Sequence, residues 1–142
     1  MKKYILLFNF ILVICLSLTA QEATSVSMPS GKEIYIPKDL QAMDLQNPDS
    51  KWSYHRMAYT DNFVIFWEKG FGNDLSNPPQ LEGHDMKVDL LNLTEKLESF
   101  YHFFRDTLKF SKPGSKCDKY SMMVMLNYSL EGTAYGGDYE GE

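Results

Sequence analysis

The pattern that most constrains this chain is a long amphipathic segment between two short runs of consecutive apolar residues. The runs are Phe63–Trp67 and residues 122–126, and neither alternates with polar residues. Such a run predicts a strand that is covered on both faces. Between them, residues 86–110 predict one long helix, because its apolar side chains recur at steps of three or four. These side chains are Leu90, Leu93, Leu97, Tyr101, Phe104 and Leu108.

The order of strand, helix and strand predicts a βαβ crossover. We therefore expect an α+β fold with an α/β-like βαβ core, in which a small mixed sheet carries one long helix. Asp85 is expected to cap that helix, and a helical turn is expected after Pro48 with Asp49 or Ser50 near its cap. The helix can cover only one face of the sheet, and no segment of the sequence is an evident cover for the other face.

The first twenty residues have the layout of a secretory signal peptide. Lys2 and Lys3 precede an apolar run at residues 4–18, and small residues lead to Ala20. The run is short for a membrane span, so an uncleaved anchor is the lesser alternative. We expect cleavage after Ala20, no stable membrane insertion afterwards, and a protein that is secreted, periplasmic or on the cell surface.

The remainder divides into a leader and one domain. Residues 21–39 are expected to be a flexible leader that ends in a short edge strand, with Ile34 and Ile36 alternating with polar neighbours. Residues 40–142 form the expected domain. Removing residues 1–20 changes the formal net charge from −5 to −7. So acidic a chain is repelled by phosphate backbones, which argues against nucleic acid as a partner.

Few side chains are spaced for catalysis or metal binding. Glu98, His102 and Asp106 lie at i, i+4 and i+8 on the expected helix, where a metal could be held, although a solvated charged face is the usual meaning of such a stripe. His84, with its acidic neighbours Glu82 and Asp85, is expected to serve the start of the helix. No catalytic residue and no zinc-binding H-E-x-x-H motif is identified.

Two further groups of residues are candidates for binding a ligand. Asp138, Glu140 and Glu142 alternate near glycines, which favours an acidic turn over a calcium loop. Several aromatic side chains could stack on sugars, although such residues more often belong to a core. These aromatic residues are Trp52, Tyr54, Tyr59, Trp67 and Tyr135.

Three stretches of the chain resemble the opening of a known family. They are residues 52–72 (WSYHRMAYTDNFVIFWEKGFG), 97–110 (LESFYHFFRDTLKF) and 118–140 (DKYSMMVMLNYSLEGTAYGGDYE). Together they are similar to secreted, zincin-like metallopeptidases of Gram-negative bacteria, over nearly all of the chain from residue 40 onward. The resemblance implies that residues 40–142 are an incomplete zincin-like N-terminal subdomain.

The resemblance also implies how such a domain would work. In these proteins an edge strand lines the substrate cleft, and a helix with H-E-x-x-H follows it and binds zinc. The corresponding strand here consists of Thr133, Ala134, Tyr135, Gly136 and Gly137. The zinc helix has no counterpart in this sequence, so we expect a truncated and inactive product with no cofactor of its own, zinc being expected only in an intact relative.

Partners follow from the same resemblance. A completed domain would take a peptide or protein substrate by pairing it with the edge strand. An incomplete sheet could instead self-associate through its open edge. The alternative to a peptidase fragment is a small secreted binding module that uses exposed aromatic residues to hold glycan or protein.

Overall fold

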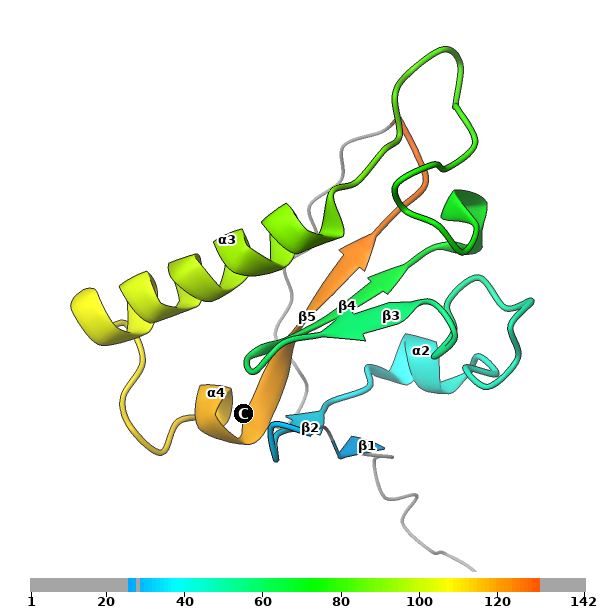
Figure 1. Ribbon diagram of the computed structural model, residues 1–142. Helices are drawn as coiled ribbons and strands as arrows, with labels where there is room; N and C mark the ends of the chain where they lie inside the picture. The colour runs from blue at the N-terminus through cyan, green and yellow to red at the C-terminus, as the bar shows by residue number, and fades with distance from the viewer. Residues whose placement is uncertain (1–25, 28, 131–142) are drawn as a thin grey trace, which may run out of the picture.

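The computed structural model describes residues 26–27 and 29–130, and it has a small α+β fold (Figure 1). Its strands are β1 (Val26–Ser27), β2 (Glu33–Ile34), β3 (Met57–Tyr59), β4 (Phe63–Trp67) and β5 (Tyr120–Leu126). Its helical elements are α2 (Lys38–Gln41), the 3-10 turn η1 (Lys69–Phe71), α3 (Leu90–His102), the π-helical turn η2 (Phe103–Thr107) and α4 (Lys116–Lys119). The expected fold class is confirmed. Within the described ranges, no helix has the length and apolar character needed to cross a membrane.

The five strands form one mixed sheet in the order β1-β2-β5-β4-β3. β4 and β5 are parallel neighbours joined through α3, as the βαβ pattern predicts. β3 forms an antiparallel hairpin with β4 that the sequence reading missed. The strand expected at Ile34 is present, but it is not at the edge. β2 lies between β1 and β5, so the prediction of an edge strand there is wrong.

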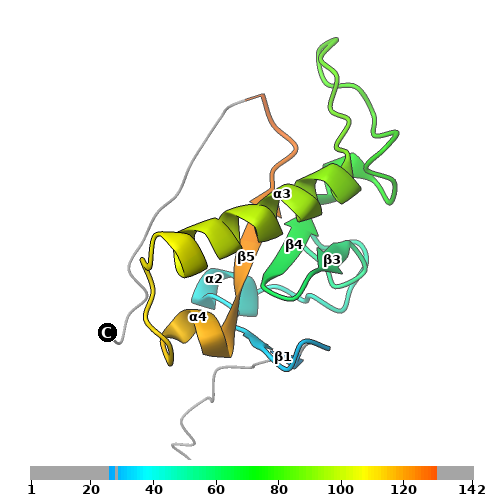
Figure 2. The ribbon, with the colours of Figure 1, turned by 60° about the vertical axis from the view of Figure 1, so that its left-hand side comes forward.

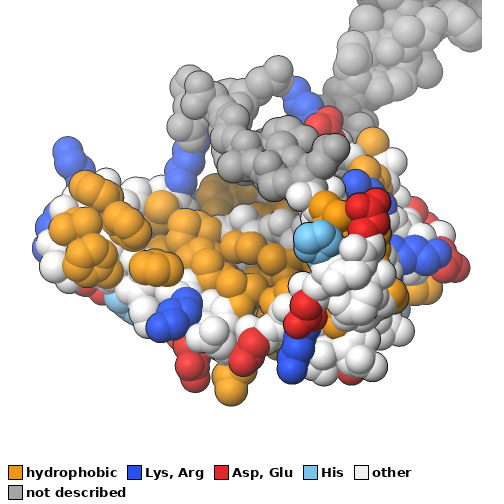
Figure 3. Space-filling model, turned by 90° about the horizontal axis from the view of Figure 1, so that it is seen from above, with side chains coloured by type: hydrophobic (Ala, Val, Ile, Leu, Met, Phe, Trp, Pro, Cys, Tyr) orange, Lys and Arg blue, Asp and Glu red, His pale blue; other side chains and the backbone are white. Residues whose placement is uncertain are grey.

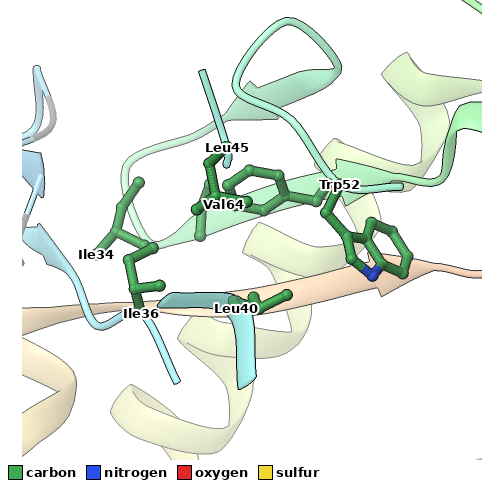
Figure 4. Packing of buried hydrophobic residues seen from close by; sticks show 7 residues of the cluster. Ile34, Ile36, Leu40, Leu45, Trp52 and Val64 are labelled. Carbon is green, nitrogen blue, oxygen red and sulfur yellow. The ribbon is translucent and has the colours of Figure 1, made fainter. Parts of the chain in front are cut away.

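One face of the sheet is covered by the N-terminal segment, residues 34–54. Figures 1 and 2 show α2 and its flanking loops on the side of the sheet opposite α3. Val64 and Phe66 of β4 point into this layer and are at most 1% exposed. Figure 4 shows Val64 with the rest of the labelled cluster around it, namely Ile34, Ile36, Leu40, Leu45 and Trp52. The expectation that no segment of the chain covers this face is therefore wrong.

The segment after Pro48 is a series of turns rather than the expected helical turn. Arg56 is 2% exposed, and its guanidinium donates to the backbone carbonyls of Pro48, Ser50 and Lys51. A charged group buried in this way needs several acceptors, and a regular helix would have used these carbonyls internally. The buried arginine thus accounts for the irregular backbone, which in turn places Trp52 over β4.

The long helix begins four residues later than expected. Asp89 is its N-cap, and the Asp89 carboxylate accepts a hydrogen bond of 3.0 Å from the backbone N–H of Asn92. Asp85, the expected cap, instead accepts from the backbone N–H of Lys87 in a preceding turn. The helix begins later because Val88 still belongs to the preceding loop. The backbone N–H of Val88 donates to the carbonyl of Leu75.

α3 lies over the second face of the sheet and covers it only in part. β4 is buried along its whole length. In β5, by contrast, the five residues from Met122 to Leu126 are all half-buried. Tyr101 is the last buried residue of the helix, and Phe104 and Leu108 are 45% and 41% exposed. The predicted apolar face therefore stops before its expected end. The backbone changes to a π-helical turn at that point, shown by the 3.0 Å bond from the Leu108 N–H to the Phe103 carbonyl.

Candidate functional site

The strand predicted to line a substrate cleft, Thr133 to Gly137, lies outside the described residues. Asp138, Glu140, Glu142 and Tyr135 lie outside them too. The candidate site in the described part is therefore the surface that leads toward this segment. It consists of β5 and the side of α3 that lies above it.

The edge of β5 that faces away from β4 is open over most of its length. β2 pairs only with Tyr120 and Ser121, so no described strand pairs with residues 122–126 on that side. The Met122 N–H donates to the carbonyl of Asn62 beside β4. Because backbone groups alternate along a strand, those of Met123 and Met125 point to the open edge. This edge is able to pair with one further extended segment.

Apolar side chains continue from this strand onto the helix, and we call them the α3–β5 surface. They are Met122, Val124 and Leu126 of β5 and Leu93, Leu97 and Phe100 of α3. All are half-buried except Phe100, which is 57% exposed. Figure 3 shows apolar side chains in a band along this side of the molecule. Surfaces of this kind commonly mark the place where another polypeptide or a membrane binds.

At the opposite border of α3, Glu98 ties the helix to the hairpin of β3 and β4. One carboxylate oxygen of Glu98 accepts from the Thr60 hydroxyl and, at 2.9 Å, from the backbone N–H of Asn62. The other accepts from the Asn62 side-chain amide at 2.7 Å. Burial pushes the pKa of Glu98 upward, but these hydrogen bonds outweigh it and leave the pKa below its ordinary value. A charged Glu98 is thus part of the folded structure.

A second set of polar contacts surrounds Tyr101, one turn further along. Its hydroxyl accepts from Lys32 at 3.3 Å and from Arg105 at 2.6 Å, and lies 3.3 Å from the carbonyl of Cys117. The Lys32 ammonium also donates to Asn62 and to the Cys117 carbonyl, both at 2.6 Å. These three bonds use every N–H of Lys32, so the lysine joins the N-terminal segment to the hairpin and to α4.

Arg105 completes this network through an ion pair with Asp118. The hydrogen bond from Arg105 lowers the pKa of Asp118, and the backbone N–H of Gly114 acts in the same direction. The sequence reading missed Lys32, Thr60 and Asn62 as members of a common site. The polar turn before the apolar strand was the only signal for them, since these partners lie 30 and 36 residues apart in the sequence.

The side chains of the Glu98, His102 and Asp106 stripe contact one another and, through Glu98, the hairpin of β3 and β4. His102 Nδ1 lies 2.8 Å from the Asp106 carboxylate, and His102 Nε2 lies 3.9 Å from the carboxylate of Glu98. The Glu98 oxygens are already taken by Thr60 and Asn62. Among the described residues no three His, Cys, Asp or Glu side chains are grouped as metal ligands. His84 is exposed in a tight turn paired with Leu81, away from the start of α3.

The aromatic residues considered for sugar stacking are mostly in the interior. Trp52 and Trp67 are 5% and 8% exposed, and the Trp67 indole N–H donates to the Gly72 carbonyl. Tyr54 is half-buried and packs on Phe66. Among the described candidates, Tyr59 is the one that is exposed. The exposed aromatic residues instead gather at the far end of α3, where the sequence analysis placed part of the core.

These features define a small α+β domain with a parallel βαβ core and one partly covered sheet face. The chain belongs to a family of unknown function, DUF6055, whose model matches residues 26–142. The match includes every described element. No curated protein and no solved structure matches the chain.

Proposed function

We propose that this chain is the N-terminal part of a secreted protein that resembles zincin-like metallopeptidases. By itself the chain is inactive in this proposal. The three resembling stretches support this, and two of them form β4 and β5 of the parallel core. In the proposal, α3 and the sheet are the scaffold of a catalytic domain. Zinc and its ligands would belong to the intact protein, where peptide or protein is the substrate.

The observation that carries the proposal is the partly covered α3–β5 surface. On the opposite face, residues 34–54 bury Val64 and Phe66 of β4 almost completely, and Met123 and Met125 of β5 are half-buried against them. On the α3 side, Met122, Val124 and Leu126 of β5 are half-buried, and the rest of the α3–β5 surface lies beside them. A further helix packed on this side would bury these side chains, which is the role that the proposal gives to the zinc-binding helix.

In the proposal, the cleft strand is the one that the resemblance implies at residues 133–137, which lie outside the described part. Substrate would pair with that strand by backbone hydrogen bonds. Within the described residues, the backbone groups of Met123 and Met125 face an edge that no described strand pairs, and a further extended segment could pair there in the same way. The signal-peptide layout of the first twenty residues supports a periplasmic, surface or secreted location.

The test begins with the DNA downstream of the Glu142 codon, read in all frames for H-E-x-x-H. If the motif is present, the protein with and without the added part is purified and its zinc content is measured. We expect about one zinc per intact protein and none in residues 21–142 alone. An apolar dye should fluoresce on the shorter protein and lose that signal on the longer one. Unrelated downstream sequence, or stoichiometric zinc in the shorter protein, contradicts the proposal.

A small binding module remains the alternative if the downstream sequence is unrelated. Its glycan version would use exposed aromatic residues, of which Trp52 and Trp67 are in the core and Tyr59 is exposed. A protein-binding version would use the α3–β5 surface. It predicts cooperative unfolding without any added segment, together with little dye binding.

A further inference from the structure

The end of α3 carries an exposed aromatic cluster that we call the phenylalanine tip. Its members are Phe100, Phe103, Phe104, Leu108 and Phe110, which are 57%, 48%, 45%, 41% and 74% exposed. The rings are ordered against each other. Phe104 stacks on Phe110 with centroids 5.5 Å apart, and Phe103 meets Phe104 edge-on at 5.7 Å. A surface cluster of large apolar side chains commonly marks a site where another polypeptide or a membrane binds.

The fold explains why the tip is exposed. Tyr101 is the last helical residue against the sheet, through its contact with Phe63 at the start of β4. Beyond it the helix has no strand beneath it, and Figure 1 shows this end of α3 projecting past the sheet. The π-helical turn η2 then places Phe103, Phe104 and Leu108 around the projecting end. Figure 3 shows apolar side chains gathered at this extremity of the molecule.

The segment that carries the tip has a charge opposite to that of the whole protein. The chain has a formal net charge of −5, yet the segment from Phe103 to Lys119 is rich in cations. Its cationic residues are Arg105, Lys109, Lys112, Lys116 and Lys119, against the carboxylates of Asp106 and Asp118. Arg105 pairs with Asp118 and Lys119 with Glu33, while Asp106 contacts His102. Lys109 and Lys112 are exposed and stand next to the tip residues in the sequence.

We infer that the phenylalanine tip binds the surface of an anionic lipid bilayer. Phenylalanines with flanking lysines suit such an interface, because the rings enter the boundary of headgroups and acyl chains while the ammonium groups remain at the phosphates. The acidic remainder of the protein is repelled from the same surface, which orients the tip toward it. A second copy of the chain fits less well, since two basic tips would repel each other.

This attachment differs from insertion of a membrane-spanning segment. Lys109 and Lys112 follow the helix rather than lying along it, so the sequence alone shows no basic amphipathic helix here. They belong to the turn between η2 and α4, where Lys109 and Gly114 adopt left-handed backbone conformations with φ of 58° and 81°. The inference does not depend on whether the protein is a peptidase.

The experiment is flotation with vesicles of phosphatidylglycerol and phosphatidylethanolamine, compared with neutral phosphatidylcholine vesicles. The protein used starts at Gln21, because the apolar run of the expected signal peptide, residues 1–20, would itself bind lipid. Every described contact lies within residues 26–130 and is therefore kept. We expect binding to the anionic vesicles and little binding to the neutral ones. Salt at about 1 M should weaken it, because the screening length falls to about 3 Å.

Variants then separate the two parts of the tip. Phe103→Ser combined with Phe110→Ser should weaken partition of the protein onto anionic vesicles at least about tenfold. Both positions are exposed, so the fold is expected to be retained. Lys109→Gln combined with Lys112→Gln should weaken it on the order of 30-fold, on anionic vesicles only. Leu91→Ser is the matched control, because Leu91 is 70% exposed on the same helix but far from the tip. It should bind like the unchanged protein.

Three results would overturn the inference. The first is a folded protein, verified by circular dichroism, that does not float with anionic vesicles. The second is binding that the Phe103 and Phe110 variant retains or that is equal on neutral vesicles. The third is concentration-dependent dimerisation that the same variant abolishes while no vesicle binding is found, which would make a second copy the occupant of the tip.

Discussion

The two faces of the sheet are covered in different ways. On one face, residues 34–54 bury Val64 and Phe66 almost completely in a continuous apolar cluster. On the other, α3 packs Tyr101 against the buried Phe63 of β4 but leaves Met122, Val124 and Leu126 of β5 only half-buried. Glu98 also ties this helix to the hairpin by hydrogen bonds from Asn62. One layer is thus held by a continuous apolar cluster, and the other combines apolar burial at β4 with charge-assisted hydrogen bonds.

The difference shows that an apolar run does not by itself determine burial. β4 and β5 are neighbours in register, and Val64 pairs with Met123 as Phe66 pairs with Met125. Yet β4 has a described strand on both edges, whereas residues 122–126 of β5 have one only on the side of β4. A central strand and a strand beside an open edge can have the same sequence character. The consequence is that the two faces should respond to different substitutions.

The largest expected effect is on the sealed face. Phe66→Ala removes a side chain that is 1% exposed from the middle of the cluster, and it should lower the free energy of unfolding by about 3–5 kcal/mol. The same change at Phe104, which is 45% exposed at the phenylalanine tip, should stay within about 0.5 kcal/mol. Urea unfolding followed by tryptophan fluorescence measures both. Equal effects at the two positions would mean that α3 packs as tightly as the N-terminal layer.

A polar substitution should act on the α3 side instead. Glu98→Gln keeps the shape of the side chain but replaces a charged acceptor of hydrogen bonds from Thr60 and Asn62. Since Glu98 is partly exposed, we expect a loss of about 1–2 kcal/mol in the free energy of unfolding. Glu95→Gln is the control, because Glu95 is exposed on the same helix and its carboxylate has no role in the tether. A loss as large for Glu95 would point to helix charge rather than to the tether.

The same pair of variants also gives a pH signature for the Glu98 tether. The pKa of Glu98 is lowered by folding, so its contribution to stability is complete above its ordinary value of 4.5 and is lost as the pH falls through the lower folded value. The stability difference between the unchanged protein and Glu98→Gln should therefore shrink as the solution is acidified below that value. A difference that grows on acidification would mean that the carboxyl is protonated in the fold.

Much of the parallel core could be predicted from the sequence. The run Phe63–Trp67 has the bounds of β4, and residues 122–126 lie within β5, because continuous β-favouring apolar residues have few other uses. β3 was missed because three residues, Met57–Tyr59, are too short a pattern to recognise. The cover from residues 34–54 was missed for a different reason. Its apolar residues are spread over β2, the short helix α2 and the turns that follow, where a buried arginine holds part of the backbone, so they leave no periodic pattern.

The candidate site was less predictable than the fold. The helical repeat predicted Phe104 and Leu108 as core, but periodicity cannot show where the sheet beneath a helix ends. The π-helical turn and the exposed rings follow from that missing support. Lys32 reaches Asn62 and Cys117 across the fold, and no local pattern predicts such a contact. The cleft strand at residues 133–137 lies outside the described part and stays a prediction.

The smallest expected effect concerns the beginning of α3. Asp89→Ala removes the carboxylate that accepts from the Asn92 N–H, which should cost about 1 kcal/mol in the free energy of unfolding. Asp85→Ala is the matched control, since Asp85 accepts only from the Lys87 N–H in the preceding turn, and it should cost less than half as much. Both changes remove one negative charge, so their difference isolates the cap. If the order were reversed, α3 would begin where the sequence pattern first suggested, and the helix would cover more of the second face than the structure shows.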